Sequence, residues 1–316
     1  MKKKVLITGG SGFLGRNLAL RLRDSYDVYL GARNNKQNFQ AKKITSTTTL
    51  PLDVSSIESV RDAVKVIRPD IIIHAAATKF VDLSEVYPME TIDTNVIGSQ
   101  NVARVAMEYD VEIVIGISTD KACPPVRNIY GLSKATMERM FCLMNGKTKT
   151  KFACVRYGNV AWSTGSVLPI WKKMHEETGV IGTTGPDMRR FFFTVDHAVE
   201  LVNNAMENID LIQGQILSRV MKSARVGDIL DVWTKNLGGK WEKIADRPGE
   251  RDDEYLVGET ELAYCQVLEF GGIKHFLIHP NQKVEVPYPA IFTSREAERL
   301  TEEEILDIIK AQPDTL

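Results

Sequence analysis

The sequence has no excess of charge of either sign. Its 316 residues include 40 lysines and arginines against 41 aspartates and glutamates, which gives a net charge of −1 at pH 7. Proteins that bind nucleic acid or anionic membranes through charge usually carry a clear basic excess. We therefore expect neither nucleic acid nor a membrane surface among the partners of this chain.

Long apolar runs and paired cysteines are missing as well. No apolar window approaches the roughly 18 residues of a membrane span, and the apolar run of about three residues after MKKK is too short for a signal peptide. The cysteines are only four and show neither a CxxC pair nor metal-ligand spacing; they are Cys123, Cys142, Cys154 and Cys265. We expect buried thiols, no metal site and a cytoplasmic protein.

The first half of the chain alternates short apolar strands with helical patterns. The expected strands are VLITGG (5–10), VYLGAR (28–33), IIIHAAA (71–77), VEIVIGIST (111–119) and KFACVRYGNV (151–160). The expected helices cover 13–24, 55–67, 90–109 and 130–145. Strands that are apolar throughout and separated by helices predict an α/β fold, a Rossmann-type doubly wound parallel sheet over residues 1–160.

The second half is less regular and predicts a smaller mixed lobe over residues 161–316. Helices are expected from Ser166, over 195–206, over 226–236 and over 301–311, with GTTGPD as a loop. Thr301 and Glu304 match a capping box before the apolar ILDII. We expect the lobe to cover the carboxyl ends of the strands, where open α/β sheets bind ligands.

A glycine-rich turn after the first strand predicts a dinucleotide site. Gly9, Gly12 and Gly15 allow a tight turn and place a pyrophosphate on a helix N-terminus; the alternative is an ordinary strand-to-helix loop. The candidate cofactor contacts are Gly9, Ser11, Gly12, Phe13, Leu14, Arg33, Asp53, Val54, Ala75, Ala76, Ala77, Tyr130 and Lys134.

The end of the second strand favours NADP over NAD. An NAD site places a carboxylate there for the ribose 2′-hydroxyl, whereas this chain has Gly31-Ala32-Arg33-Asn34. A guanidinium suits a 2′-phosphate, although Arg33 could also be a solvated surface cation. Asp53 could bind the adenine amine or cap a helix together with Ser55.

One short segment, ISTDKACPPVRNIYGLSK (117–134), carries the candidate catalytic groups. Tyr130 and Lys134 are one helical turn apart, so the ammonium can stabilise a phenolate that takes a hydroxyl proton. Thr119, Asp120 and Lys121 add a hydrogen-bonding hydroxyl, an acid and a base. A simple alcohol dehydrogenase does not need the second acid–base pair; the alternative reading of Asp120 and Lys121 is a surface ion pair.

The chain resembles the extended short-chain dehydrogenase/reductases, and among them the inverting UDP-N-acetylglucosamine 4,6-dehydratases of pseudaminic acid and capsule polysaccharide biosynthesis. The matching segments are HAAATKFV (74–81), ETIDTNVIGSQNV (90–102), STDKA (118–122), NIYGLSK (128–134), RYGNVAWSTGSVLP (156–169), MRRFFFT (188–194), RPGE (247–250) and LTEEEI (300–305). The resemblance extends over nearly the whole length of the chain.

The resemblance implies a mechanism in which NADP oxidises C4 of a UDP-sugar, water is lost across C5 and C6, and hydride returns to C6. Tyr130 would be the C4 base, with Lys134 as its partner and Thr119 bound to the C4 oxygen. Asp120 would be the acid at C6, which requires a raised pKa. Lys121 would be the base at C5, and we expect burial and nearby cations to lower its pKa towards about 7–8.

The same resemblance implies a set of residues around the substrate. Asn95 would orient the active-site helix, and Lys79 would lie near the sugar. The substrate-binding candidates are Lys79, Asn95, Asn159, Ser166, Arg190, Arg247 and Glu250. An arginine can bind diphosphate oxygens through two parallel hydrogen bonds, which favours Arg190 and Arg247.

The chain departs from the family pattern near the sugar, where GERDDEYLV (249–257) stands for a more usual GEKLHEELI. Three other readings stay open: a UDP-sugar 4-epimerase, a dehydratase that stops at an unsaturated or 5-epimerised product, and a non-catalytic dinucleotide sensor. Relatives pair through the helices near 90–109 and 130–145, so a homo-oligomer is expected.

Overall fold

A nine-stranded sheet forms the centre of the computed structural model, which describes residues 2–245 and 250–313. The strand order is β14 (Cys265–Phe270), β15 (Ile273–Ile278), β10 (Ile216–Arg219), β6 (Lys151–Arg156), β5 (Ile113–Ile117), β4 (Ile71–His74), β1 (Lys4–Thr8), β2 (Asp27–Ala32) and β3 (Thr48–Pro51). The strands from β10 to β3 run parallel, whereas β15 runs antiparallel to both β10 and β14. The prediction of a Rossmann-type α/β sheet is confirmed.

The sheet contains a switch point at β1, which pairs with β2 on one side and β4 on the other. The chain winds outward in both directions from this point, which leaves a crevice at the carboxyl ends of the strands. All residues of β4 and β5 are buried. Helices cover both faces of a parallel sheet, and this explains why these strands are apolar without alternation.

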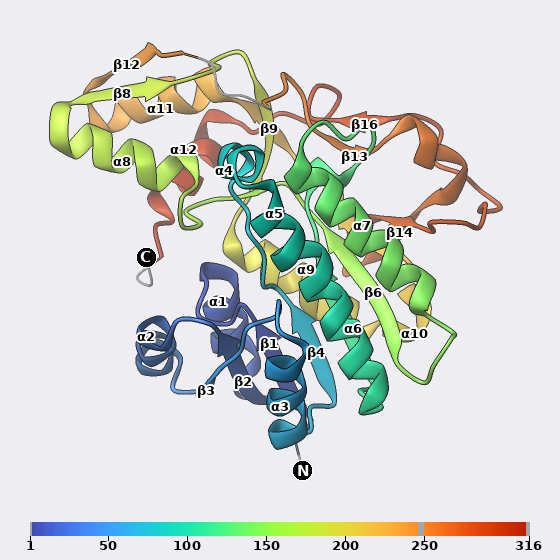
Figure 1. Cartoon of the computed structure of the whole chain (residues 1–316). Coiled ribbons are helices and arrows are strands. Elements are labelled where there is room, and N and C mark those ends of the chain that lie inside the picture. The colour runs from blue at the N-terminus through green and yellow to red at the C-terminus, as the bar shows by residue number, and fades with distance from the viewer. Residues whose placement is uncertain (1, 246–249, 314–316) are drawn as a thin grey trace.

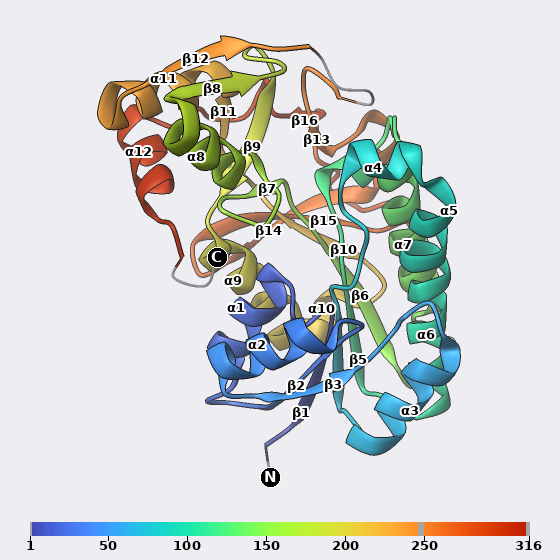
Figure 2. The ribbon, with the colours of Figure 1, turned by 60° about the vertical axis from the view of Figure 1, so that its left-hand side comes forward.

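Helices form a layer on each side of the sheet, as Figures 1 and 2 show. One layer consists of α1 (Phe13–Leu22), α2 (Asn35–Thr45), α9 (Val195–Glu207) and α10 (Ile209–Ile212). The other consists of α3 (Ile57–Ile67), α4 (Val81–Val86), α5 (Pro88–Thr91), η1 (Ile92–Ile97), α6 (Gly98–Glu108) and α7 (Ile129–Met144). The turn η2 (Asp120–Ala122) connects β5 to the segment before α7.

The helix predicted over residues 90–109 contains a π-helical segment. The α-helical turns of α5 and α6 flank η1, and together they form one helical stretch from residue 88 to 108. A π turn inserts an extra residue into an α-helix and often marks a functional region. Here it contains Asn95, whose side chain is fully buried against the neighbouring helix α7.

A lobe covers the carboxyl ends of the strands, at the top of Figure 2. It consists of β7 (Asn159–Val160), α8 (Val167–Thr178), β8 (Val180–Thr183), β9 (Arg189–Phe193), β11 (Ser223–Arg225), α11 (Val226–Leu237), β12 (Lys240–Lys243), β13 (Tyr255–Val257), η3 (Glu259–Tyr264), β16 (Phe292–Thr293) and α12 (Glu302–Lys310). The predicted capping box is confirmed, because the Thr301 hydroxyl accepts from the Glu304 N–H and the Glu304 carboxylate accepts from the Thr301 N–H.

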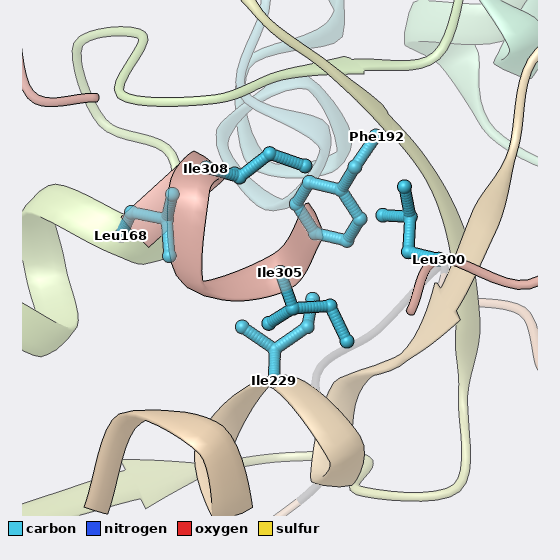
Figure 3. A pocket seen from close by; sticks show the side chains of 6 residues that line it. All are labelled: Leu168, Phe192, Ile229, Leu300, Ile305 and Ile308. Carbon is cyan, nitrogen blue, oxygen red and sulfur yellow. The ribbon is translucent and has the colours of Figure 1, made fainter. Parts of the chain in front are cut away.

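The lobe has an apolar core of its own, shown in Figure 3. Side chains from α8, β9, α11 and the C-terminal segment meet there without leaving room for a water molecule; they are Leu168, Phe192, Ile229, Leu300, Ile305 and Ile308. The Trp162 indole N–H donates to the Ile308 carbonyl at 2.8 Å. These contacts hold α12 against the rest of the lobe.

The boundary predicted at residue 160 does not separate the sheet from the lobe. Three strands of the nine-stranded sheet, β10, β14 and β15, come from the second half of the chain. GTTGPD, predicted as a loop, begins with the last two residues of β8. The sequence analysis also missed α2 and β3: the buried residues of α2 are Asn38, Ala41 and Thr45, so the helix has no apolar stripe to reveal it.

Candidate active site

A cleft of about 1260 Å³ opens between the carboxyl ends of the strands and the lobe. Most of the predicted site residues line it: Gly9, Ser11, Gly12, Phe13, Leu14, Arg33, Val54, Ala75, Ala76, Ala77, Lys79, Thr119, Lys121, Tyr130, Lys134, Asn159, Ser166, Arg190 and Glu250. Asp53, Asn95 and Asp120 lie off its surface, and Arg247 lies outside the described residues.

The glycine turn lies directly against the loop that follows β4. Gly9 has a φ of +66°, and a Cβ there would lie 2.7 Å from the Ala76 nitrogen. Gly12 is the N-cap of α1, and a Cβ on Gly15 would lie 2.6 Å from the Gly10 Cα. The turn therefore brings a bare helix N-terminus to the floor of the cleft, a cradle that fits a pyrophosphate.

The end of β2 carries no acidic side chain into the cleft. Arg33 and Asn34 line it together with Gln37, and the Asn34 side chain caps α2 by accepting from the Gln37 N–H at 3.1 Å. The Asp53 carboxylate accepts from the Ser55 N–H at 3.0 Å and from the Ser55 hydroxyl at 2.7 Å. The helix that follows is capped by Ser56 instead, so Asp53 shapes the turn before α3.

A glycine allows the helix that carries Tyr130 to pack against the turn that carries Lys121. A Cβ on Gly131 would lie 2.2 Å from the Lys121 carbonyl oxygen, so no larger residue fits without moving the backbone. The Asn128 side chain caps α7 by accepting from the Gly131 N–H at 2.8 Å. This close packing fixes the start of α7 beside η2.

Lys134 is buried beneath the cleft, with 3% of its surface exposed. Its Nζ donates to the Ile117 carbonyl at 2.8 Å, and burial lowers its pKa to about 8. Burial raises the pKa of Tyr130, while the charge of Lys121 and a hydrogen bond with Thr119 oppose this rise. Lys121 is a cation that lowers the pKa of Tyr130 in the structure, and the role expected of Lys134 as partner of the phenolate stays a prediction.

The acid–base pair Asp120–Lys121 lies next to a second carboxylate. Lys121 Nζ is 3.0 Å from Asp120 Oδ1 and 3.3 Å from Glu254 Oε1. Burial and the charge of Glu254 raise the pKa of Asp120 despite the opposing effect of Lys121, the direction expected of an acid. Asp120 is fully buried, and a Cβ on the cleft residue Gly158 would lie 3.2 Å from its Oδ2.

The pKa of Lys121 departs from the expectation of a lowered value. Burial lowers it, but the charges of Asp120 and Glu254 raise it, and the net result is a pKa above the ordinary value. Arg190 is the cation that acts against this rise. The charges of two carboxylates within 3.3 Å of the ammonium therefore outweigh the effect of burial.

The predicted substrate residues lie in different parts of the site. Ser166 is the N-cap of α8, and its buried hydroxyl has no hydrogen-bond partner among the described residues. Glu250 accepts from the Thr184 hydroxyl at 2.9 Å. The Asn95 amide donates to the Thr78 carbonyl and to the Ser133 hydroxyl, both at 2.9 Å, so it links α7 to the loop after β4 and does not reach the cleft.

Sequence reasoning missed Glu254 and its neighbour Arg251. Glu254 lines the cleft and is 3% exposed, and Arg251 Nη2 is 3.2 Å from its Oε2. Both belong to GERDDEYLV, the segment noted for its departure from the family pattern. A cluster of acids beside an arginine was a visible signal, but its distance along the chain from Asp120 concealed the contact.

Within residues 2–245 and 250–313, no group of three or more histidines, cysteines, aspartates or glutamates is placed to hold a metal ion. No helix of the described chain has the length and apolar character to span a bilayer.

Comparisons with known proteins agree with this geometry. The family model for polysaccharide biosynthesis proteins matches residues 5–270. The inverting UDP-N-acetylglucosamine 4,6-dehydratase of Campylobacter jejuni is 33% identical over 282 residues, which covers 84% of this chain and 82% of that protein. The UDP-glucose 4-epimerase of Rickettsia bellii is 36% identical over 284 residues and covers 84% and 81%.

Among solved structures, Pen from Bacillus thuringiensis superimposes with a TM-score of 0.90 at 28% identity, over 100% of this chain and 98% of that one. The Rossmann-type sheet, the glycine turn and the Tyr-x-x-x-Lys helix define an extended short-chain dehydrogenase/reductase. Within that class, the chain belongs to the polysaccharide biosynthesis protein family, whose model matches from β1 to the end of β14. It is an enzyme of the nucleotide-sugar branch, as its dehydratase and epimerase relatives indicate.

Proposed function

We propose that this enzyme is an NADP-dependent UDP-N-acetylglucosamine 4,6-dehydratase, a lyase that inverts C5. One observation carries the proposal: the Asp120–Lys121 pair lies beside Tyr130 at the dinucleotide cleft. Oxidation at C4 needs only a tyrosine base, whereas loss of water across C5 and C6 needs a separate acid and base. The similarity to the Campylobacter enzyme supports the same activity.

The cleft fits a dinucleotide, because a Cβ would fill the cradle at Gly9 and the N-terminus of α1 faces it. When bound, NADP would supply the hydride acceptor for C4 and the hydride donor for C6. Tyr130 takes the C4 hydroxyl proton. The Thr119 hydroxyl hydrogen-bonds Tyr130 and donates to Asp120 Oδ1 at 3.0 Å, so it connects the C4 base to the C6 acid.

Lys121 removes the C5 proton, which the C4 ketone has made acidic, and Asp120 protonates the leaving C6 hydroxyl. The raised pKa of Asp120, due first to burial, favours the protonated acid. The proton taken from C4 can return to Asp120 through Thr119, which restores the acid after water has left. Inversion then requires that C5 receive a solvent proton on the face opposite Lys121, which releases its own proton to solvent.

Arg33 supports the choice of NADP over NAD. It lines the cleft at the end of β2, and residues 33–40 contain no carboxylate to bind a ribose 2′-hydroxyl. A guanidinium at this point matches a 2′-phosphate.

The main alternative is a UDP-sugar 4-epimerase, which the similarity to the Rickettsia enzyme favours. An epimerase uses the same tyrosine and lysine but has no use for an acid and a base at C6 and C5. The buried carboxylates around Lys121 favour dehydration instead.

We also propose a cytoplasmic homo-oligomer. The four cysteines are free and buried, as expected in a reducing compartment. Exposed apolar side chains gather on α4, α5 and α7, a surface suited to a second copy; they are Leu83, Val86, Tyr87, Met89 and Leu132.

The deciding experiment is incubation with NADP and UDP-N-acetylglucosamine in deuterated water, followed by mass spectrometry and proton NMR. We expect loss of one water, a new C6 methyl group and deuterium at C5, with ring couplings that report inversion. An isomer of unchanged mass would establish the epimerase. Loss of water without a methyl group would identify an unsaturated product, and no reaction would overturn the proposed substrate.

A further inference from the structure

Glu254 enters the candidate active site from the loop before β13, far along the chain from the predicted catalytic segment. Its backbone is held on both sides by Ser294, whose hydroxyl accepts from the Glu254 N–H at 3.0 Å and whose N–H donates to the Glu254 carbonyl at 2.8 Å. The side chain lines the cleft and is almost fully buried. The fold therefore presents a fixed carboxylate beside Lys121.

Five other charged or titratable side chains make up the site around Glu254. Asp120 and Lys121 belong to η2, Tyr130 to α7, Arg190 to β9 and Arg251 to the same loop as Glu254. Arg190 Nε is 3.9 Å from Glu254 Oε1, and Arg251 Nη2 is 3.2 Å from Oε2. Burial raises the pKa of Glu254, but Lys121, Arg190 and Arg251 lower it below its ordinary value.

Lys121 is shared between two carboxylates, and their environments differ. The Glu254 carboxylate has two arginines beside it, whereas the Asp120 carboxylate contacts Lys121 and the Thr119 hydroxyl and, within the described residues, no arginine. Asp120 Oδ2 is buried without a hydrogen-bond partner in the described part of the chain. Burial and the charge of Glu254 raise the pKa of Asp120, whereas Lys121 and the two arginines lower the pKa of Glu254 despite its burial.

This arrangement favours the acid over the base. A raised pKa favours the protonated Asp120 that the C6 hydroxyl needs. Lys121, held 3.3 Å from Glu254 Oε1, has to be neutral before it can take a proton from C5.

We propose that Glu254 is a positioning residue for the elimination, which holds the Lys121 side chain beside Asp120 and favours the protonated form of Asp120. The inference rests on the proposed dehydratase function. Glu254 is not itself the proton acceptor, because the two arginines beside it and Lys121 hold its pKa below the ordinary value.

Neutral Lys121 takes the C5 proton while Asp120 gives its proton to the departing hydroxyl. Lys121 then loses that proton to solvent, and C5 receives a solvent proton on the opposite face. The C4 proton held by Tyr130 restores Asp120 through Thr119, so that each of these groups regains its starting protonation state.

The experiment compares Glu254→Gln and Glu254→Asp with the wild type and with Asp253→Asn as a matched control. Asp253 is the adjacent carboxylate, but it pairs with Arg189 at 3.1 Å and Arg295 at 2.9 Å. Each variant is assayed with UDP-N-acetylglucosamine for water loss by mass spectrometry. The absorbance of reduced nicotinamide measures C4 oxidation separately, and thermal melting verifies folding.

In Glu254→Gln we expect kcat for water loss to fall about 10²-fold, with little change in KM and with reduced nicotinamide still formed. The lost anion no longer raises the pKa of Asp120, so Asp120 ionises earlier and the alkaline limb of the kcat profile moves to lower pH. Glu254→Asp keeps the carboxylate and should recover part of the rate. Asp253→Asn should match the wild type.

Two results would overturn the inference: Glu254→Gln behaving like Asp253→Asn, or C4 oxidation and water loss falling together without recovery in Glu254→Asp. A wild type that converts the sugar without losing water would instead refute the proposed function, and the inference with it.

Discussion

Lys134 combines a positive charge with near-complete burial. Its ammonium contacts the Ile117 carbonyl at 2.8 Å and lies 3.8 Å from the Met137 sulfur. A buried ammonium lacks the hydration that stabilises its charge, so burial lowers its pKa from 10.5 to about 8. At neutral pH the buried charge of Lys134 therefore lowers the stability of the fold, but it places a cation beneath the cleft.

This burial predicts a pH dependence of stability. Between about pH 8 and 10.5 the folded protein has released the Lys134 proton while the unfolded chain retains it, so stability rises with pH over this range. Over this pH range the free energy of unfolding of the wild type should rise by up to about 3 kcal/mol relative to that of Lys134→Met. Denaturant unfolding at a series of pH values measures this difference. A difference that stays constant with pH would contradict the prediction.

Lys121 provides a second test at the same scale. Lys121→Ala removes the proposed C5 base but none of the residues of the glycine turn, so NADP and the UDP-sugar should still bind. We expect loss of water to fall by about 10²- to 10⁴-fold, with dissociation constants for both ligands measured by calorimetry close to those of the wild type. Normal turnover would remove Lys121 from the mechanism.

The motifs that could be read from the sequence are those whose partners are near neighbours along the chain. The pairs Asp120–Lys121 and Tyr130–Lys134 are fixed by one strand end and one helical turn, so spacing alone predicts their proximity. Glu254 reaches the same site only because the chain returns after several lobe elements. Its role, and its contribution beside Asp120 to the raised pKa of Lys121, could not be predicted from spacing.

Among the elements, the junction of α7 and η2 is the most restrictive. Gly131 occupies the first turn of α7, where alanine would ordinarily improve helix stability by about 1 kcal/mol. Here its Cβ would lie 2.2 Å from a backbone oxygen of η2, and overpacking of this kind costs about 1–3 kcal/mol. The close contact outweighs the helix propensity.

We therefore expect Gly131→Ala to displace η2 together with Asp120 and Lys121. A displacement of about 1 Å in a catalytic group can reduce the rate about 10²-fold. The measurement is kcat together with the melting temperature, and both should fall. Leu132→Ala, at the next and half-exposed position, serves as the control. An unchanged kcat in Gly131→Ala would show that the junction can adapt.

The helices and strands that could be predicted from the sequence are those with a clear pattern of apolar residues. The strands β4 and β5 are buried throughout, and α9 and α11 bury one face each. The polar helix α2 gave no such signal, since its exposed face includes Phe39 and its buried face includes Asn38. Tertiary packing, with the Asn38 amide bound to the Ala32 carbonyl at 2.8 Å, stabilises it instead.

At the scale of the whole molecule, a buried ion cluster joins the sheet to the segments around the site. Arg156 on β6 binds the Glu138 carboxylate on α7 at 2.9 and 2.7 Å and the Glu261 carboxylate on η3 at 2.9 and 2.8 Å. The Cys123 thiol contacts Glu261 at 3.2 Å. The cluster connects α7, the end of η2 and the lobe segment that follows β13.

Removing only the arginine of this cluster should lower stability more than replacing the arginine and both glutamates with apolar residues. Arg156→Met leaves two buried carboxylates without their cation, so we expect a loss of about 3–5 kcal/mol. Replacing Glu138 and Glu261 by leucine in the same protein removes the uncompensated charges and should recover most of the loss. Urea unfolding of both variants measures the difference, and equal losses would contradict the argument.

The path of the chain between the sheet and the lobe also limits how the enzyme can move. The chain leaves the sheet after β6, returns at α9 and β10, leaves again at β11, returns at β14 and β15, and ends in the lobe at α12. A hinge between the sheet and the lobe needs few connecting segments, because all of them have to rotate together. Here several segments connect the two parts, and each of them is anchored in the sheet. We therefore expect a nucleotide sugar to enter by local movements of loops and side chains, so the radius of gyration in solution should hardly change when it binds.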